Sequence, residues 1–141
     1  MAYTGATYTD KLNTVVADLK HTGYTDTTKN KFSKGQCTWY CFGRAIERAG
    51  VTLSITGNGG QWYANAESTR KRAKSLGPIS KSIASFSNTG AGHVVFIEQV
   101  SGNDVYFTEG NSWVADGTVQ KKTKAQFETL WSNTLQGYIT L

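Results

Sequence analysis

Hydrophobic residues recur with a helical period in the first half of the chain, which predicts helices over residues 8–21, 37–50 and 61–76. Residues 22–36 are polar and aperiodic, which is typical of a surface loop, and Pro78 stops the third helix. The expected helical faces are Leu12, Val15, Val16 and Leu19 in the first segment, Trp39, Phe42, Ile46 and Ala49 in the second, and Trp62, Ala66, Thr69, Ala73 and Leu76 in the third.

The second half of the chain changes from the helical period to short extended segments. The expected strands cover residues 82–86, 92–100, 105–109, 118–122 and 136–140. A brief helix is expected over residues 124–131. Helices followed by strands predict an α+β domain in which N-terminal helices pack on a C-terminal antiparallel sheet. Short interior loops favour a single domain over 1–141, with an N-terminal helix and loop in 1–30 before a core in 31–141.

Composition excludes several classes of protein. Hydrophobic residues make up 38% of the chain and aromatic residues 12%, which is too many for a disordered chain and enough for a core. The longest uncharged apolar run covers four residues, 94–97, whereas a membrane helix needs about 20, so we expect no membrane insertion. Residues 1–7 contain neither a basic nor an apolar segment, so no signal peptide is expected.

The chain carries 15 Lys and Arg against 10 Asp and Glu, which gives a net charge of +5 and an isoelectric point near 9.3. Much of the surplus falls in residues 67–90, largely on the expected third helix. It is either a solvated helix face or a patch that attracts an anionic polymer. A nucleic acid is disfavoured as a partner, because no nucleic-acid motif is present and aromatic residues do not alternate with the basic ones.

The two cysteines do not indicate a disulfide framework or a metal site. Cys37 and Cys41 are four residues apart, and we interpret both as thiols, with Cys41 as a small buried side chain. Two His and two Cys match no zinc spacing. We therefore expect no metal ion and no cofactor.

Cys37 and His93 are the candidates for chemistry. Cys37 lies where a loop meets the second helix, and a helix N-terminus stabilises a thiolate through its unpaired N–H groups and dipole. His93 begins an apolar strand directly after a glycine, where a rigid sheet can project the imidazole into a cleft. Each residue could equally be structural.

A hairpin between the strands that follow His93 brings Glu109 and Asn111 back toward it. Either side chain could orient the imidazole. A turn centred on residues 102–103 would place Glu109 opposite Phe96 instead of His93. We therefore expect a bulge or an irregular turn, or else a larger orienting role for Asn111.

Three segments, residues 35–40, 92–98 and 108–113, give the chain a family resemblance. In this order and at these intervals they resemble the CHAP family, the cysteine, histidine-dependent amidohydrolases/peptidases. The resemblance covers about residues 30–141. It implies a papain-like fold and hydrolysis of amide bonds in bacterial peptidoglycan.

The resemblance also implies roles for individual residues. Cys37 would be the nucleophile, His93 the general base and then the acid, and Glu109 the group that orients His93. Gln36 would form an oxyanion hole together with the Cys37 backbone N–H, and Asn111 would be a supporting polar residue.

Two further expectations concern substrate and ions. Trp113, at the end of the third segment, is expected to form a cleft wall that contacts substrate. Some CHAP relatives bind calcium through an acidic loop before the cysteine. Here Asp26 is accompanied by three lysines in that stretch, so no calcium is expected.

Several alternatives stay open at this stage. The scissile bond is either the glycan–peptide amide or an amide within the stem or cross-bridge. A non-enzymatic wall-binding module is the alternative to an enzyme. In showing no signal peptide the chain resembles phage lysins, so we expect it to be made in the host cytoplasm and to reach the wall after release. We expect a monomer, with any wall-binding domain outside this chain.

Overall fold

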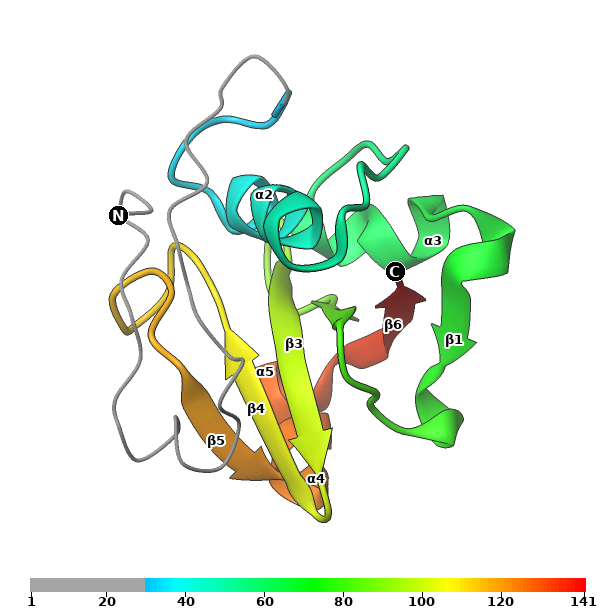
Figure 1. Cartoon of the computed structure of the whole chain (residues 1–141), viewed down its shortest axis with the longest axis vertical. Coiled ribbons are helices and arrows are strands. Elements are labelled where there is room, and N and C mark those ends of the chain that lie inside the picture. Colours follow the sequence, from blue (N-terminus) through cyan, green and yellow to red (C-terminus); the bar gives the residue numbers. More distant parts are fainter. Residues whose placement is uncertain (1–29) are drawn as a thin grey trace.

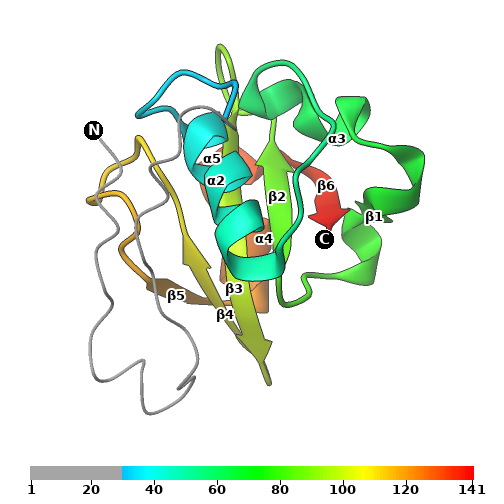
Figure 2. The same ribbon diagram turned by 45° about the horizontal axis from the view of Figure 1, so that its top comes forward.

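The computed structural model describes residues 30–141. The helix expected over residues 8–21, and most of the loop expected over 22–36, lie outside this range. Within it, an antiparallel sheet carries helices on both faces (Figures 1 and 2). The expected α+β class is confirmed.

The sheet contains six strands in the described part of the chain, in the order β1-β6-β2-β3-β4-β5, and all neighbours are antiparallel. The strands are β1 (Lys71–Ala73), β2 (Ser82–Phe86), β3 (His93–Ser101), β4 (Asp104–Thr108), β5 (Gln120–Thr123) and β6 (Leu135–Thr140). The five expected strands are all present, with bounds shifted by at most two residues. β1 was not expected.

Helix α2 (Cys37–Ala49) covers one face of the sheet, in front of β3 in Figure 2. It ends where the sequence predicts, because Gly50 adopts the left-handed conformation, with φ of 69°. Its buried aromatic side chains pack in one core cluster with residues of β2 and β3. The apolar stripe of this helix therefore aligns it along the strand that starts at His93.

The opposite face is covered by α4 (Lys124–Glu128) and α5 (Leu130–Asn133). The side chain of Thr123 accepts a hydrogen bond from the backbone N–H of Gln126 and so caps α4. Phe127 packs edge-on against Phe86 and Phe107, with ring centroids 5.9 Å and 5.1 Å apart. The single helix expected over 124–131 is instead two short pieces.

The helix predicted over residues 61–76 is wrong. This stretch forms a 3₁₀ turn at Gly59–Gln61, the short helix α3 (Trp62–Asn65), strand β1, and further turns at Ser68–Arg70 and Lys74–Leu76. The helix ends at Ala66, whose backbone is extended, and Leu76 is 63% exposed. Residues 71–73 therefore pair with β6 and do not continue the helix that the periodicity predicts.

The basic residues of this stretch consequently lie on an edge strand and its turns, and the expected basic helix face does not exist. Several of them support the turns by donating to backbone carbonyls. Arg70 donates to Thr140 at 3.1 Å and Arg72 to Gly77 at 2.8 Å. Lys71 donates to a carbonyl of α3 at 2.9 Å.

A β-bulge at Glu98 interrupts the pairing of β3 with β4. The buried carboxylate of Glu98 accepts two hydrogen bonds from Arg44 of α2, at 2.8 Å and 2.9 Å, and one from Thr108 at 2.7 Å. Burial lowers the pKa of Arg44, but the hydrogen bonds and charge of Glu98 outweigh burial and hold that pKa above its ordinary value. The bulge is thus held to α2 by a buried ion pair.

Candidate active site

Cys37 is the first residue of α2 and is partly exposed. Gln36 precedes the helix with an extended backbone, and its side chain makes no capping hydrogen bond. Its backbone carbonyl instead accepts the N–H of Tyr40 at 3.0 Å. The thiol therefore lies at the positive end of the helix, as expected, beside a side chain that is not used for capping.

His93 is the first residue of β3 and is buried. A close crossing of two backbone segments positions it. A Cβ on Gly92, whose φ is 74°, would lie 2.4 Å from the backbone of Gly60, and one on Gly59 would lie 2.9 Å from the backbone of His93. The N–H of Gly60 donates to the carbonyl of Ala91 at 2.9 Å. The glycines before the histidine are therefore needed for this crossing.

The bulge at Glu98 sets the face on which Glu109 lies. Near the turn, Val100 pairs with Val105, a register that would align Glu109 with Phe96 on the α2 face. Beyond the bulge Phe96 pairs with Thr108, so the register continues with Glu109 opposite residue 95. One extra residue in β3 therefore moves Glu109 to the face that His93 occupies. The expected irregularity of the hairpin is confirmed.

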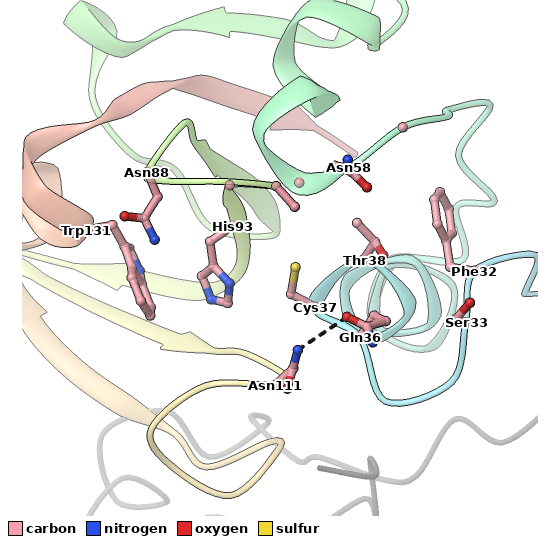
Figure 3. Close-up of a pocket in the computed structure, with 14 residues that line it drawn as sticks. Phe32, Ser33, Gln36, Cys37, Thr38, Asn58, Asn88, His93, Asn111 and Trp131 are labelled. Carbon is pink, nitrogen blue, oxygen red and sulfur yellow. Dashed lines mark hydrogen bonds between the residues drawn. The ribbon is translucent and has the colours of Figure 1, made fainter.

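Glu109 is hydrogen-bonded to His93. The Glu109 Oε1 atom lies 2.6 Å from His93 Nε2, and Gln120 of β5 donates to Glu109 Oε2, also at 2.6 Å. Figure 3 shows the Cys37 sulfur and the His93 ring facing each other across the cleft. Because Nε2 is bonded to Glu109, Nδ1 is the ring nitrogen left for Cys37. The side chains of Cys37, His93, Glu109 and Gln120 thus follow one another, each next to the one before.

These neighbours control the charge of His93. Burial lowers the pKa of its imidazole, but the hydrogen bonds and charges of Cys37 and Glu109 outweigh burial and raise the pKa to about 9. The imidazolium form is therefore favoured at neutral pH. Cys41, one turn further along α2, has a thiol whose pKa is raised by burial, and it is enclosed in the core.

Asn111 lies on the other side of the cleft entrance and does not orient His93. Its side-chain amide donates to Gln36 Oε1 at 3.3 Å, and its backbone N–H donates to the buried carboxylate of Asp116 at 2.9 Å (Figure 3). Burial raises the pKa of Asp116. Of the two expected candidates, Glu109 and not Asn111 is hydrogen-bonded to His93. Asn111 instead positions Gln36, whose amide nitrogen forms no hydrogen bond with any other described residue.

The sequence did not indicate Trp131 or Gln120. The indole of Trp131 packs on the His93 ring, with centroids 4.4 Å apart and planes at 47°. Its backbone φ of 54° is left-handed, which no hydrophobic period encodes. Gln120 could have been inferred only from the pairing of β5 with β4, since its partner is eleven residues away.

A cleft of about 530 Å³ opens in front of Cys37 and His93. Its lining includes Phe32, Gln36, Thr38, Asn58, Asn88, Asn111 and Trp131 (Figure 3). Trp113 is not part of this lining. It is 91% exposed and borders a neighbouring groove, so its contact with substrate stays a prediction.

Within residues 30–141, no group of three or more His, Cys, Asp or Glu side chains is arranged to hold a metal ion. No helix in this part of the chain has the length and apolar character needed to span a membrane.

One known protein and one family model match this chain in sequence. The staphylococcal secretory antigen ssaA2 of Staphylococcus aureus is 32% identical over 102 residues, which are 72% of this chain and 36% of that protein. The chain therefore spans about a third of the length of this relative. A model of the CHAP domain matches residues 27–111.

Two solved structures share the fold. The N-acetylmuramoyl-L-alanine amidase from Staphylococcus aureus superimposes with a TM-score of 0.60 at 18% identity, covering 90% of this chain and 36% of that one. The crystal structure of Ly7917 superimposes with a TM-score of 0.55 at 16% identity, covering 79% of this chain and 55% of that one.

The family model extends over the start of α2 and the start of β3 and ends at Asn111, so it includes the segments that carry the cysteine, the histidine and the glutamate. The fold agrees with it independently. The chain belongs to the CHAP domain family.

Proposed function

We propose that this chain is a peptidoglycan hydrolase that cuts an amide bond with Cys37 as its nucleophile. The observation that carries the proposal is that Cys37 and His93 face each other in an open cleft, with Glu109 hydrogen-bonded to Nε2 of His93. A similar fold occurs in a protein named as an N-acetylmuramoyl-L-alanine amidase, and the Ly7917 structure was also solved with "the hydrolyzing product of MDP". Both support a substrate from the bacterial wall.

The first half of the reaction is acyl transfer to the cysteine. The Cys37 thiolate attacks the amide carbonyl carbon and forms a C–S bond, and the carbonyl oxygen becomes an oxyanion. The Cys37 backbone N–H and the Gln36 side-chain amide donate to that oxygen. The C–N bond then breaks, and the imidazolium of His93 passes its proton to the leaving amine. The products are a thioester and a free amine.

The second half is hydrolysis of the thioester. Neutral His93 takes a proton from water, and the hydroxide attacks the thioester carbonyl. The C–S bond breaks, the carboxylic product leaves, and the enzyme returns to its thiolate and imidazolium pair. Glu109 stabilises the imidazolium and holds the ring through Nε2 in both halves.

The experiment that tests this proposal compares the two thiols. Cys37→Ala should abolish release of muropeptides from purified cell walls, while Cys41→Ala should retain it, because Cys41 does not line the cleft. Circular dichroism establishes that both variants are folded. Hydrolysis by folded Cys37→Ala at the wild-type rate would refute the proposal. Binding to walls without release of muropeptides by the wild type would favour a wall-binding module instead.

The scissile bond is assigned by the products. Mass spectrometry of digested walls distinguishes a glycan freed of its peptide from a new N-terminus within the stem or cross-bridge. We propose one of these two amide classes, since the same three side chains serve both.

Iodoacetamide should label Cys37 ahead of Cys41, because the Cys41 thiol is buried and burial raises its pKa.

A further inference from the structure

Trp131 lies between the catalytic cleft and a second groove. It lines the cleft itself, a shallow region formed with Asn111, Ser112 and Trp113, and a groove of about 260 Å³. The lining of this second groove includes Glu109, Trp113, Gln120, Lys122, Leu130 and Trp131. Trp131 is thus a lining residue that the three concave regions have in common.

Trp131, which lines the second groove, lies beyond His93 from the nucleophile Cys37. This is the side on which we expect the leaving group. In Figure 3 Trp131 lies beside His93, on the side away from Cys37. In the proposed reaction the leaving amine receives its proton from His93. That reaction would direct the amine side of the substrate over His93 toward Trp131, and the acyl side toward Gln36 and Phe32, which also line the cleft.

The backbone at Trp131 is strained, and several contacts maintain that strain. Three successive residues, 131 to 133, have φ values of 54°, 60° and 59°. The Thr134 hydroxyl donates to the Trp131 carbonyl at 2.6 Å and accepts the backbone N–H of Asn88 at 2.9 Å. Strained backbone that the surroundings maintain is typical of functional sites. Here it holds the indole at the boundary between cleft and groove.

The charged side chains that line the second groove are those of Lys122 and Glu109. Lys122 pairs with Val105 and Gln120 with Phe107, so both side chains lie on the sheet face that carries Glu109. Both Glu109 oxygens are already bonded, to His93 and Gln120. The Lys122 ammonium forms no ion pair or hydrogen bond with any residue in the described range.

We propose that the second groove binds the amine-side part of the substrate, and that Lys122 recognises a carboxylate on it. The exposed indole of Trp113 and the indole of Trp131 provide apolar surface for the peptide between the scissile bond and that carboxylate. The preferred substrates are thus amides whose leaving peptide carries a free acid. This inference rests on the proposed hydrolase function.

The test uses two synthetic substrates with the scissile bond identified from digested walls. They differ only in the leaving peptide, which carries a free carboxylate in one and the corresponding carboxamide in the other. Wild type should show about two- to fivefold higher kcat/KM for the carboxylate, the range expected for a solvent-exposed ion pair. In Lys122→Gln this preference should disappear, because kcat/KM for the carboxylate should fall to that for the carboxamide.

Lys121→Gln is the matched control. Lys121 is the adjacent exposed lysine of β5, but it pairs with Tyr106 and lies on the opposite face, so the preference should persist. An equal preference in wild type and Lys122→Gln, or none in wild type, would overturn the subsite. If wild type cleaves neither substrate and releases nothing from walls, the hydrolase proposal itself fails.

Discussion

His93 lies at the centre of the candidate active site, and its neighbours hold it from three sides. Cys37 lies in front of the ring, Glu109 binds Nε2, and Trp131 packs on the ring. The charged neighbours outweigh the effect of burial and raise the pKa of His93 to about 9. The site therefore favours the imidazolium form of His93 at neutral pH.

The pH dependence of activity tests this charge state. Because the imidazolium must protonate the leaving amine, wild-type activity should fall as pH rises through about 9. Glu109→Gln removes a hydrogen bond and a charge that raise the pKa of His93, so this alkaline limb should move to lower pH. We expect kcat/KM at neutral pH to fall about 10²–10⁴-fold.

The control is Glu67→Gln, which makes the same substitution at a carboxylate that is 51% exposed and outside the site. It should retain both the rate and the pH profile of wild type. An alkaline limb that is unchanged in Glu109→Gln would contradict the assigned role of Glu109.

Gln120 is a positioning residue that acts through Glu109. Gln120→Glu places a second carboxylate at the Glu109 oxygen that now accepts a hydrogen bond, so the two would share a proton or repel each other. In the first case the charge facing His93 weakens, and the pKa of His93 should fall. NMR titration of the imidazole measures that pKa, with Lys121→Ala as the control on the same strand. An unchanged His93 titration together with unchanged kcat/KM would show that Gln120 has no such role.

At the scale of the elements, two features bring Cys37, His93 and Glu109 together. The bulge in β3 turns Glu109 toward His93, and the buried pair of Glu98 and Arg44 ties that bulge to α2. The crossing of the glycine segments before α3 and before β3 places the His93 backbone. A helix, a hairpin and a glycine turn, separated in sequence, therefore converge on one end of the sheet.

Gly92 and Gly90 allow this crossing to be tested. Both have positive φ, 74° and 64°, but an added Cβ meets the Gly60 backbone at 2.4 Å only at Gly92, and meets nothing within 4 Å at Gly90. Gly90→Ala should therefore cost about 1–2 kcal/mol of the free energy of unfolding, from backbone conformation alone. Gly92→Ala should cost more and should also displace His93 and lower activity. Denaturant unfolding and wall hydrolysis measure the two effects, and equal losses in both variants would show that the crossing is not tight.

At the scale of the whole molecule, charge and shape bear on how the protein meets a polymer. The net charge is +5, and the basic residues of β1 and its turns lie at the edge of the sheet opposite β5. Arg70 and Arg72 use their guanidinium groups on backbone carbonyls, so they contribute to the local structure as well as to the field. An anionic polymer would therefore be attracted by the overall charge and not by one helix face.

Varying the salt concentration distinguishes electrostatic attraction to the wall from the rate of amide hydrolysis itself. Wall hydrolysis should slow by about tenfold as salt is raised, because added ions screen attraction between charged surfaces. Hydrolysis of a short uncharged peptide with the same scissile bond should change little. Wall hydrolysis that is independent of salt would show that the net charge does not contribute.

Much of this arrangement can be predicted from the sequence because it depends on local patterns. The apolar stripe and Gly50 define helix α2, and short extended apolar segments such as residues 94–97 define the strands, so Cys37 falls at a helix start and His93 at a strand start. The need for a hairpin irregularity also follows from counting residues between His93 and Glu109. These features involve residues close in sequence.

Tertiary contacts account for the rest. The periodicity of residues 61–76 favours a helix, but residues 71–73 pair with β6 instead. Trp131 reaches His93 through a left-handed turn held by Thr134, and Gln120 reaches Glu109 from the neighbouring strand β5. Local periodicity contains no information on such contacts, because their free energy comes from partners that only the folded chain brings together.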